Sequence, residues 1–208
     1  MMKIDLHVHS SERSTCAKSG QEEQIQAAIA SGLDALVMTD HGYLVPQMYL
    51  DFLNRKYAPF RIFGGIEITV QEREDVLVLG GHDPALESSE WTYPELHTFV
   101  RRHGGWLAIA HPFRYRPTID VDLERYPPDA LEVCSMNVPR GERDHIREIA
   151  TRLGIQVICN SDSHIVHTIG VAYNCLDEIP ADEAALIRLL CTGAFNCVCT
   201  LTLESIHA

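Results

Sequence analysis

The sequence has no apolar run close to the roughly 20 residues that a helix needs to cross a bilayer. It also lacks an apolar signal segment, because Met1-Met2-Lys3 leads directly into a short strand-like stretch. Its seven cysteines show no paired spacing. These absences argue against a membrane protein and against a secreted protein held together by disulfides. They predict a soluble chain that works in the reducing cytoplasm.

Low-complexity runs and linker-like segments are missing too, so residues 1–208 are expected to form a single domain. Positive charge is scarce: 17 Lys and Arg stand against 29 Asp and Glu, which gives a formal net charge of −12. That balance argues against binding a long nucleic acid, although it leaves room for a small anionic substrate. The eleven histidines are the notable excess. Imidazole is the commonest metal ligand and a frequent acid or base.

Short apolar runs alternate with helical patterns along the chain. Runs typical of strands cover residues 4–9, 33–39, 60–70, 76–79, 106–110, 130–134, 155–159, 171–175 and 195–203. Helical spacing of apolar residues covers residues 21–31, 46–57, 94–103, 140–153 and 182–191. Residues 113–128 carry three prolines and several arginines without any period, which predicts an active-site loop. The alternation is typical of parallel α/β folds.

Potential metal ligands follow, or lie within, five of the strand-like runs. His7 and His9 alternate with Val8, so both imidazoles project from one face of the first strand. The others are Asp40, His41, Glu67, His111, Asp162 and His164. An open sheet gathers its site between two strands, whereas a barrel collects residues from many strand ends. The pattern therefore predicts a closed or nearly closed α/β barrel.

This ordered set of residues resembles the PHP superfamily, which is named for polymerase and histidinol phosphatase domains. The likeness runs from the first strand to Gly170. It implies a distorted TIM-like (β/α)7 barrel with parallel strands, a cluster of two or three divalent metal ions at the carboxyl ends of those strands, and hydrolysis of phosphate esters.

The resemblance also implies a ligand set. It places His7, His9, Glu67 and Asp162 around a first metal, and Glu67 bridges to a second metal that is held by His111. His41 and His164 are expected to hold a third. Mixed imidazole and carboxylate ligands suit zinc, manganese or iron better than magnesium or calcium.

Two positions depart from the family pattern. Members usually carry a further His or Asp in the loop after the first strand, where this chain has Thr15, with Glu12 and Cys16 as alternatives. The second metal usually has another ligand after the run at 130–134, where Cys134 offers a thiolate. The alternative for Cys134 is a small, buried apolar residue.

Two arginines and two aspartates complete the candidates. Arg114 and Arg116 follow His111 and could clamp a phosphate, because guanidinium binds phosphate oxygens in a bidentate way. A solvated loop is the alternative for both. Asp40 is expected to support catalysis by orienting His41 or another ligand. Asp5 is expected to be a buried carboxylate that accepts hydrogen bonds.

The leading functional hypothesis is a metal-dependent phosphoesterase acting on a small-molecule or nucleotide phosphomonoester. One alternative is a metal-dependent hydrolase of carbon–nitrogen bonds, which would have little use for arginines beside the metals. The other is a non-catalytic metal-binding module, since two ligand positions lack an obvious match. The oligomeric state and the substrate stay open at this point.

Overall fold

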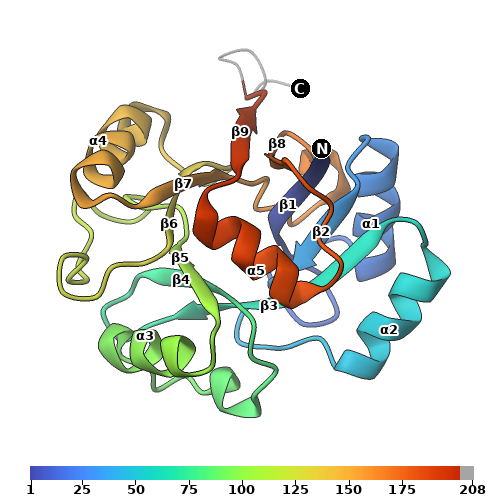
Figure 1. Cartoon of the computed structure of the whole chain (residues 1–208), viewed down its shortest axis with the longest axis horizontal. Coiled ribbons are helices and arrows are strands. Elements are labelled where there is room, and N and C mark those ends of the chain that lie inside the picture. Colours follow the sequence, from blue (N-terminus) through green and yellow to red (C-terminus); the bar gives the residue numbers. More distant parts are fainter. Residues whose placement is uncertain (202–208) are drawn as a thin grey trace.

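The computed structural model describes residues 1–201. Its helices and strands follow the predicted alternation closely (Figure 1). The strands are β1 Met2–Val8, β2 Ala35–Met38, β3 Arg61–Thr69, β4 Asp75–Leu79, β5 Trp106–Ile109, β6 Ala130–Cys134, β7 Gln156–Cys159, β8 Ala172–Leu176 and β9 Phe195–Cys199. The α-helices are α1 Gln21–Ala30, α2 Gln47–Lys56, α3 Tyr93–Arg102, α4 Arg143–Leu153 and α5 Glu183–Thr192. Short 3-10 helices cover Pro84–Glu87, Arg140–Glu142 and Val166–Thr168. The predicted strand at 195–203 ends at Cys199, and its residues 202 and 203 lie outside the described residues.

The strands form one nine-stranded sheet in the order β7-β6-β5-β4-β3-β2-β1-β8-β9. Seven of them run in one direction, because only β4 and β8 are antiparallel to their neighbours on both sides. β4 forms an antiparallel hairpin with β3. The mostly parallel sheet curls into a nearly closed barrel, which confirms the predicted distorted TIM-like fold.

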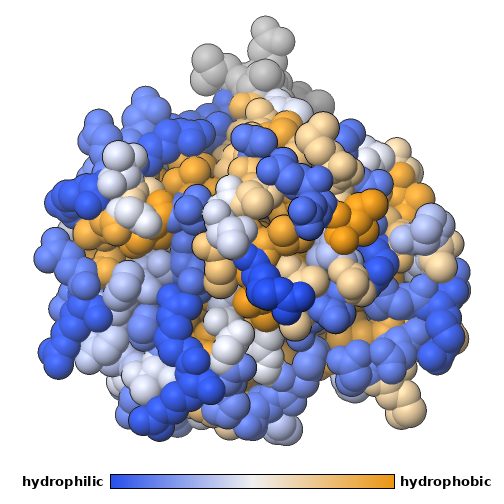
Figure 2. Space-filling model, viewed as in Figure 1, coloured by the Kyte–Doolittle hydropathy of each residue, from blue (hydrophilic) through white to orange (hydrophobic). Residues whose placement is uncertain are grey.

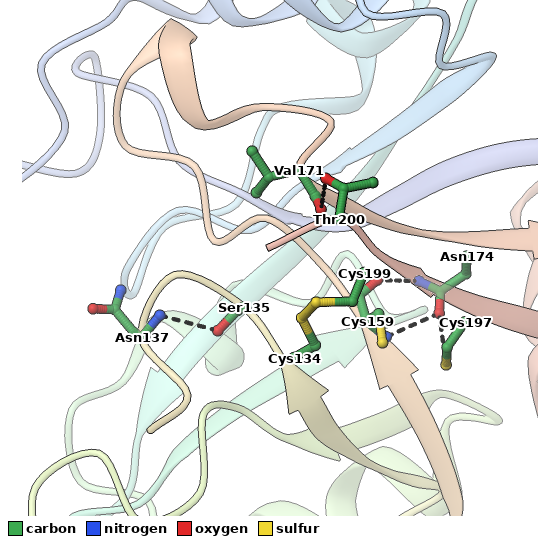
Figure 3. The surroundings of a disulfide bond; sticks show 9 residues. All are labelled: Cys134, Ser135, Asn137, Cys159, Val171, Asn174, Cys197, Cys199 and Thr200. Atoms are coloured by element: carbon green, nitrogen blue, oxygen red, sulfur yellow. Dashed lines mark hydrogen bonds between the residues drawn. A yellow bond between two sulfur atoms is a disulfide. The ribbon is translucent and has the colours of Figure 1, made fainter. Parts of the chain in front are cut away.

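The two ends of the sheet meet on the side of β7 and β9. No ladder of backbone hydrogen bonds joins these two strands within residues 1–201, but the thiol of Cys197 in β9 contacts the carbonyl oxygen of Val157 in β7 at 3.0 Å. A disulfide links Cys134 at the end of β6 to Cys199 at the end of β9 (Figure 3). At the mouth of the barrel, the amide of His9 donates to the carbonyl oxygen of Ser163 at 2.9 Å. The segments after β1 and β7 therefore lie side by side, as a barrel requires.

The disulfide corrects two expectations. The cysteines were expected to be unpaired, because their spacing shows no disulfide pattern. Cys134 and Cys199 are 65 residues apart in sequence, and only the return of β9 to the barrel wall brings them together. Cys134 is fully buried, and its sulfur is bonded to Cys199, so it is not available as a thiolate ligand.

The interior of the barrel is apolar and is closed at one end by α5. Leu186 and Leu190 of this helix pack against inward-facing residues of the strands, among them Ile4, Phe63 and Trp106. In Figure 1, α5 crosses the front of the barrel, and the other four α-helices lie around the outside. Helices α1 and α2 cover the outer face near β1 to β3, and α3 and α4 cover the outer face near β5 to β7. The α5 end is thus filled by packing, and the opposite end is left for polar side chains.

The surface around α5 is mixed in character. Figure 2 shows this face, where hydrophobic residues appear in separate patches between hydrophilic side chains. Among residues 1–201, no helix has the length and apolar character that would let it span a bilayer.

Gly105, at the start of β5, provides a test of how tightly the barrel wall is packed. A Cβ atom there would lie 2.6 Å from the carbonyl oxygen of Gly80 and 2.9 Å from that of Leu79, and neither backbone atom can move easily. We expect Gly105→Ala to lower the free energy of unfolding by about 1–3 kcal/mol, as overpacking of cores does. Urea unfolding of the metal-free protein measures this change. Gly141→Ala is the matched control, because nothing lies within 4 Å of a Cβ there, and its effect should stay within about 0.5 kcal/mol.

Candidate metal centre

Histidines and carboxylates from five strand ends converge at the mouth of the barrel opposite α5. His7 lies in β1 and Glu67 in β3, and both side chains are fully buried. The other members follow their strands by one to five residues: His9 after β1, His41 after β2, His111 after β5, and Asp162 and His164 after β7. The structure therefore brings together the seven histidine and carboxylate residues that the sequence nominated as ligands. Cys134, the eighth candidate, is not among them.

Four buried atoms face one another at the centre of this cluster. The Nε2 atom of His7 lies 3.3 Å from Glu67 Oε2 and 3.3 Å from Asp162 Oδ1. The Nε2 atom of His9 lies 3.2 Å from each of the same two oxygens. None of the four atoms makes a hydrogen bond to any group in residues 1–201. They are orphaned polar atoms in a fully buried position.

The second nitrogen of each imidazole explains why the first is orphaned. His7 Nδ1 lies 3.1 Å from Glu132 Oε1, so a proton on Nδ1 is held by that carboxylate. His9 Nδ1 lies 3.3 Å from the hydroxyl of Ser14; this hydroxyl donates its one proton to Asp40 at 2.7 Å, so toward His9 it acts as an acceptor. Both rings are thus oriented with a lone pair on Nε2 toward the centre.

Lone pairs and carboxylate oxygens that face one another without a shared cation repel each other. The pKa values respond to this arrangement. Burial acts to lower the pKa of His7, but Asp162, Glu67 and Glu132 outweigh burial and raise it. The pKa of His9 is raised to about 9, against the effect of burial, by Asp162 and Glu67. Both carboxylates have a lowered pKa, because the neighbouring imidazoles overcome the effect of burial. The site therefore demands positive charge at its centre.

A divalent metal fits that demand. Four donors at about 2.0–2.1 Å from a tetrahedral zinc ion are separated by roughly 3.3 Å, which is close to the distances between the four orphaned atoms. Three overlapping groups have their candidate ligand atoms within 4.8 Å of one another: His7, His9 and Asp162; His7, Glu67 and His111; and His9, His41 and His164. The donor set is the mixture of imidazole and carboxylate that zinc, manganese and iron accept.

Glu67 lies between these groups. Its Oε1 atom is 3.0 Å from His111 Nε2, and its Oε2 atom is 3.0 Å from His41 Nδ1. The two oxygens thus face different imidazoles, as a carboxylate that bridges two cations would.

The backbone at two of these residues is strained. His111 has a φ of 27° and Asp162 a φ of 53°, both in the left-handed region that residues with a side chain seldom adopt. Such strain is concentrated at functional sites, where the surrounding structure holds it in place. Here the amide of His111 donates to Glu132 Oε2 at 2.9 Å, and the side chain of Asn137 donates to Asp162 Oδ2 at 2.5 Å.

We call residues 113–128 the active-site loop. Within this loop, Arg114 is the cation nearest to the cluster. Its Nη1 atom lies 3.4 Å from His111 Nε2 and 4.0 Å from Asp162 Oδ2, and its side chain is 27% exposed. The guanidinium packs over the ring of Tyr115 at 4.8 Å from the ring centroid. Arg114 therefore stands at the rim, within reach of an anion bound at the centre.

Other candidates lie elsewhere. Asp40 contacts none of the ligand imidazoles directly, because its carboxylate accepts from Ser10, Arg13 and Ser14. It is linked to His9 through Ser14, an arrangement that fits the expected role of orienting a ligand. Arg116 is also directed away, as its guanidinium binds backbone carbonyls and Asp120.

None of the nominated positions in the loop after β1 belongs to the three groups of candidate ligands. Glu12 accepts from the amide of Gln21 at the start of α1, at 2.9 and 3.0 Å. Thr15 and Cys16 are exposed, and neither belongs to the three groups. Asp5 matches its expected role: it is fully buried, it accepts from the amides of His7 and Ser161, and burial raises its pKa to about 7.

Three residues of the site were missed as such in the sequence: Glu132, Ser14 and Asn137. Glu132 carried a signal, since it is a carboxylate in the middle of the apolar run of β6. Ser14 and Asn137 carried none, because a serine and an asparagine in polar loops are ordinary.

Comparisons with known proteins agree with this geometry. Residues 5–177 match the model of the PHP domain. The protein named "Probable phosphatase YcdX" from Shigella flexneri is 26% identical over 226 residues, which cover 91% of this chain and 90% of that protein. PsfC from Pseudomonas syringae PB-5123 has a similar structure, with a TM-score of 0.70 at 19% identity over 96% of this chain and 91% of that one. The crystal structure of "a putative metal-dependent phosphoesterase" from Bifidobacterium adolescentis gives a TM-score of 0.67 at 14% identity, over 91% of this chain and 96% of that one. At these identities the two structures establish a shared fold.

Glu67→Gln tests the bridging role. An amide has no negative charge and offers one oxygen, so we expect this variant to lose more than one metal ion per chain. Elemental analysis of the purified protein measures the stoichiometry. Replacing His41 should remove less metal, because its side chain is 35% exposed and it faces only one oxygen of Glu67. Glu74→Gln is the matched control, a buried carboxylate outside the three groups. Equal metal content in wild type and Glu67→Gln would contradict the bridge.

Glu132→Gln tests how His7 is oriented. Glu132 binds His7 Nδ1 and the amide of His111, and an amide in its place weakens the hold on the His7 proton. We expect metal affinity to fall by about 10- to 100-fold, as it does when such supporting carboxylates are replaced. Competition with a chelator measures the affinity. An unchanged metal affinity, with an unchanged Tm of the metal-free protein, would show that Glu132 does not orient His7 for metal binding.

Proposed function

The chain belongs to the PHP domain family, and on that premise we propose that it is a metal-dependent phosphoesterase that hydrolyses a small-molecule or nucleotide phosphomonoester. The observation that carries the proposal is the pairing of the buried, orphaned donor cluster with Arg114 at its rim. The cluster fits two or three divalent cations, and zinc, manganese or iron suit its ligands. The arginine adds a group that recognises phosphate oxygens.

When bound, divalent metal ions lower the pKa of a coordinated water to near neutrality and neutralise charge on phosphate oxygens. The residues of the chain hold the metal ions and orient the phosphate. His7 and His9 present neutral Nε2 atoms because Glu132 and Ser14 hold their Nδ1 protons. Arg114 binds the non-reacting oxygens of the phosphate and so fixes its orientation toward the cluster.

A cavity beside the cluster supports a small substrate. It has a volume of about 720 Å³ and is lined by Thr69, Arg73, Asp75, Tyr115, Arg116 and Asp120. Asp75 Oδ2 lies 3.9 Å from His111 Nε2, so the cavity adjoins the candidate ligands directly. This volume is within the range of sites for nucleotide-sized ligands. The acidic balance of the chain disfavours a long nucleic acid.

Hydrolysis of a carbon–nitrogen bond is the alternative activity. It would use the same cluster, because the same activated water can attack a carbonyl. Arg114 separates the two, since a neutral amide offers no anionic oxygens for a guanidinium beside the metals. A non-catalytic module is the weaker alternative, because all seven nominated imidazole and carboxylate ligands are assembled.

Arg114→Ala tests the phosphate role. A charged hydrogen bond contributes about 1.5–3 kcal/mol, and each 1.36 kcal/mol is about tenfold in rate. We therefore expect kcat/KM for a phosphomonoester such as p-nitrophenyl phosphate to fall by about ten- to a hundredfold, with unchanged metal content. Arg114→Lys should recover only part of the loss, because it lacks the planar two-point contact.

Arg125→Ala is the matched control for Arg114→Ala. Arg125 is an exposed arginine of the same loop that packs over the ring of Tyr126, and its removal should leave kcat/KM unchanged. If Arg114→Ala is as active as wild type, Arg114 does not bind the phosphate. If the wild-type protein hydrolyses an amide or a lactam but no phosphoester, the proposed function itself is wrong.

A further inference from the structure

Arg116 joins the active-site loop to the turn between β3 and β4, residues 70–74. Its Nη1 atom donates to the carbonyl oxygen of Glu72 at 3.0 Å, and its Nη2 atom donates to that of Arg73 at 3.3 Å. The same Nη1 donates to Asp120 at 2.5 Å, an aspartate of its own loop. The side chain is only 23% exposed. One guanidinium therefore binds two backbone carbonyls of the turn and also Asp120 of its own loop.

A second contact reinforces this junction from the other side. The amide of Asp120 donates to Glu74 Oε1 at 3.0 Å, and Glu74 is buried. Asp120 is in turn fixed by Thr118, whose hydroxyl donates to its Oδ1 at 2.7 Å. The turn itself is defined, since Arg73 adopts a left-handed φ of 65° and its amide donates to Val70.

The residues between the anchors of the loop are the functional ones. Phe113 is the first anchor: its side chain is 8% exposed and stacks on the ring of His145 at 4.9 Å. Arg116 is the second anchor. Only Arg114 and Tyr115 lie between them. Arg114 lies beside His111 Nε2, and the exposed ring of Tyr115 is 6.4 Å from the His111 ring.

We propose that Arg116 is a positioning residue that fixes Arg114 against the metal centre by locking the active-site loop to the β3–β4 turn. This inference rests on the proposed function, in which Arg114 binds the phosphate. β3 also carries Glu67, so the lock ties the carboxylate at the centre and the arginine at the rim to one rigid hairpin. Arg116 also lines the cavity proposed for the substrate, but three of its five N–H donors bind the turn and Asp120, and its role in this proposal is to hold the loop.

A double-mutant cycle separates positioning from an independent effect. We expect Arg116→Ala to lower kcat/KM for p-nitrophenyl phosphate by about tenfold, since small displacements of a positioning group have effects of that size or larger. In an Arg114→Ala background, Arg116→Ala should cause no further loss, because the residue it positions is gone. Arg116→Lys should restore part of the activity, since one ammonium can reach a carbonyl or Asp120 but not both carbonyls at once. Metal content should match wild type throughout.

Two measurements do not depend on turnover. Calorimetric binding of inorganic phosphate should weaken in Arg116→Ala as it does in Arg114→Ala. Trypsin should cleave faster after Arg114 in Arg116→Ala than in wild type, because the peptide bond to Tyr115 is no longer held between two anchors. Arg125→Ala is the control for both, and it should match wild type.

If the losses of Arg114→Ala and Arg116→Ala multiply in the double variant, or if Arg116→Ala is as active as wild type, Arg116 does not position Arg114. If Arg116→Ala fails to fold, Asp120→Asn replaces it, since it removes the ion pair without changing side-chain size, and the same absence of further loss with Arg114→Ala is expected. If wild type hydrolyses no phosphomonoester, the proposed function fails, and phosphate binding and proteolysis still decide whether Arg116 holds the loop.

Discussion

The mouth of this barrel is organised around two carboxylates and two imidazole nitrogens that face one another in its interior. Glu67 and Asp162 are fully buried, and isolated charges in such a place are strongly unfavourable. A shared cation converts these repulsions into attractions, so metal binding and the stability of the site are coupled. The left-handed backbone at His111 and Asp162 adds about 1–3 kcal/mol each, which the surrounding contacts must offset. The cluster is therefore a place where stability is given up for binding.

The barrel meets this cost by separating its two ends. At the α5 end, Leu186 and Leu190 complete an apolar interior. At the other end, β1, β2, β3, β5 and β7 deliver the candidate ligands, and β6 delivers the supporting carboxylate of Glu132. Glu132 lies where the two regimes meet, in an apolar strand but directed at His7 and the amide of His111. Such a division is general in barrels, where one face serves stability and the other serves chemistry.

The parts that could be predicted from sequence are those that follow from local pattern. His7 and His9 share a face because strands alternate, and the apolar runs that precede Asp40, His111 and Asp162 mark strand ends. The features that could not be predicted depend on contacts between segments that are far apart in the sequence. The pairing of Cys134 with Cys199 needs β9 to close the sheet, and the direction of Asp40 is set by serines of the loop after β1. Neither meeting leaves a trace in the spacing of the residues involved.

The loop after β1 supports the candidate ligands through hydrogen bonds of Ser14. Ser14 binds His9 Nδ1, Asp40 and the amide of His41, so the loop supports two candidate ligands in place of supplying one. The group of His9, His41 and His164 has three imidazoles and no carboxylate of its own, and its nearest carboxylate, Glu67, also faces the other groups. The group of His7, His9 and Asp162 has a carboxylate of its own. Because opposite charge adds to the attraction for a divalent ion, we expect the all-imidazole group to bind a divalent ion most weakly. Whether two or three metals are held is then a question of affinity and not of fold.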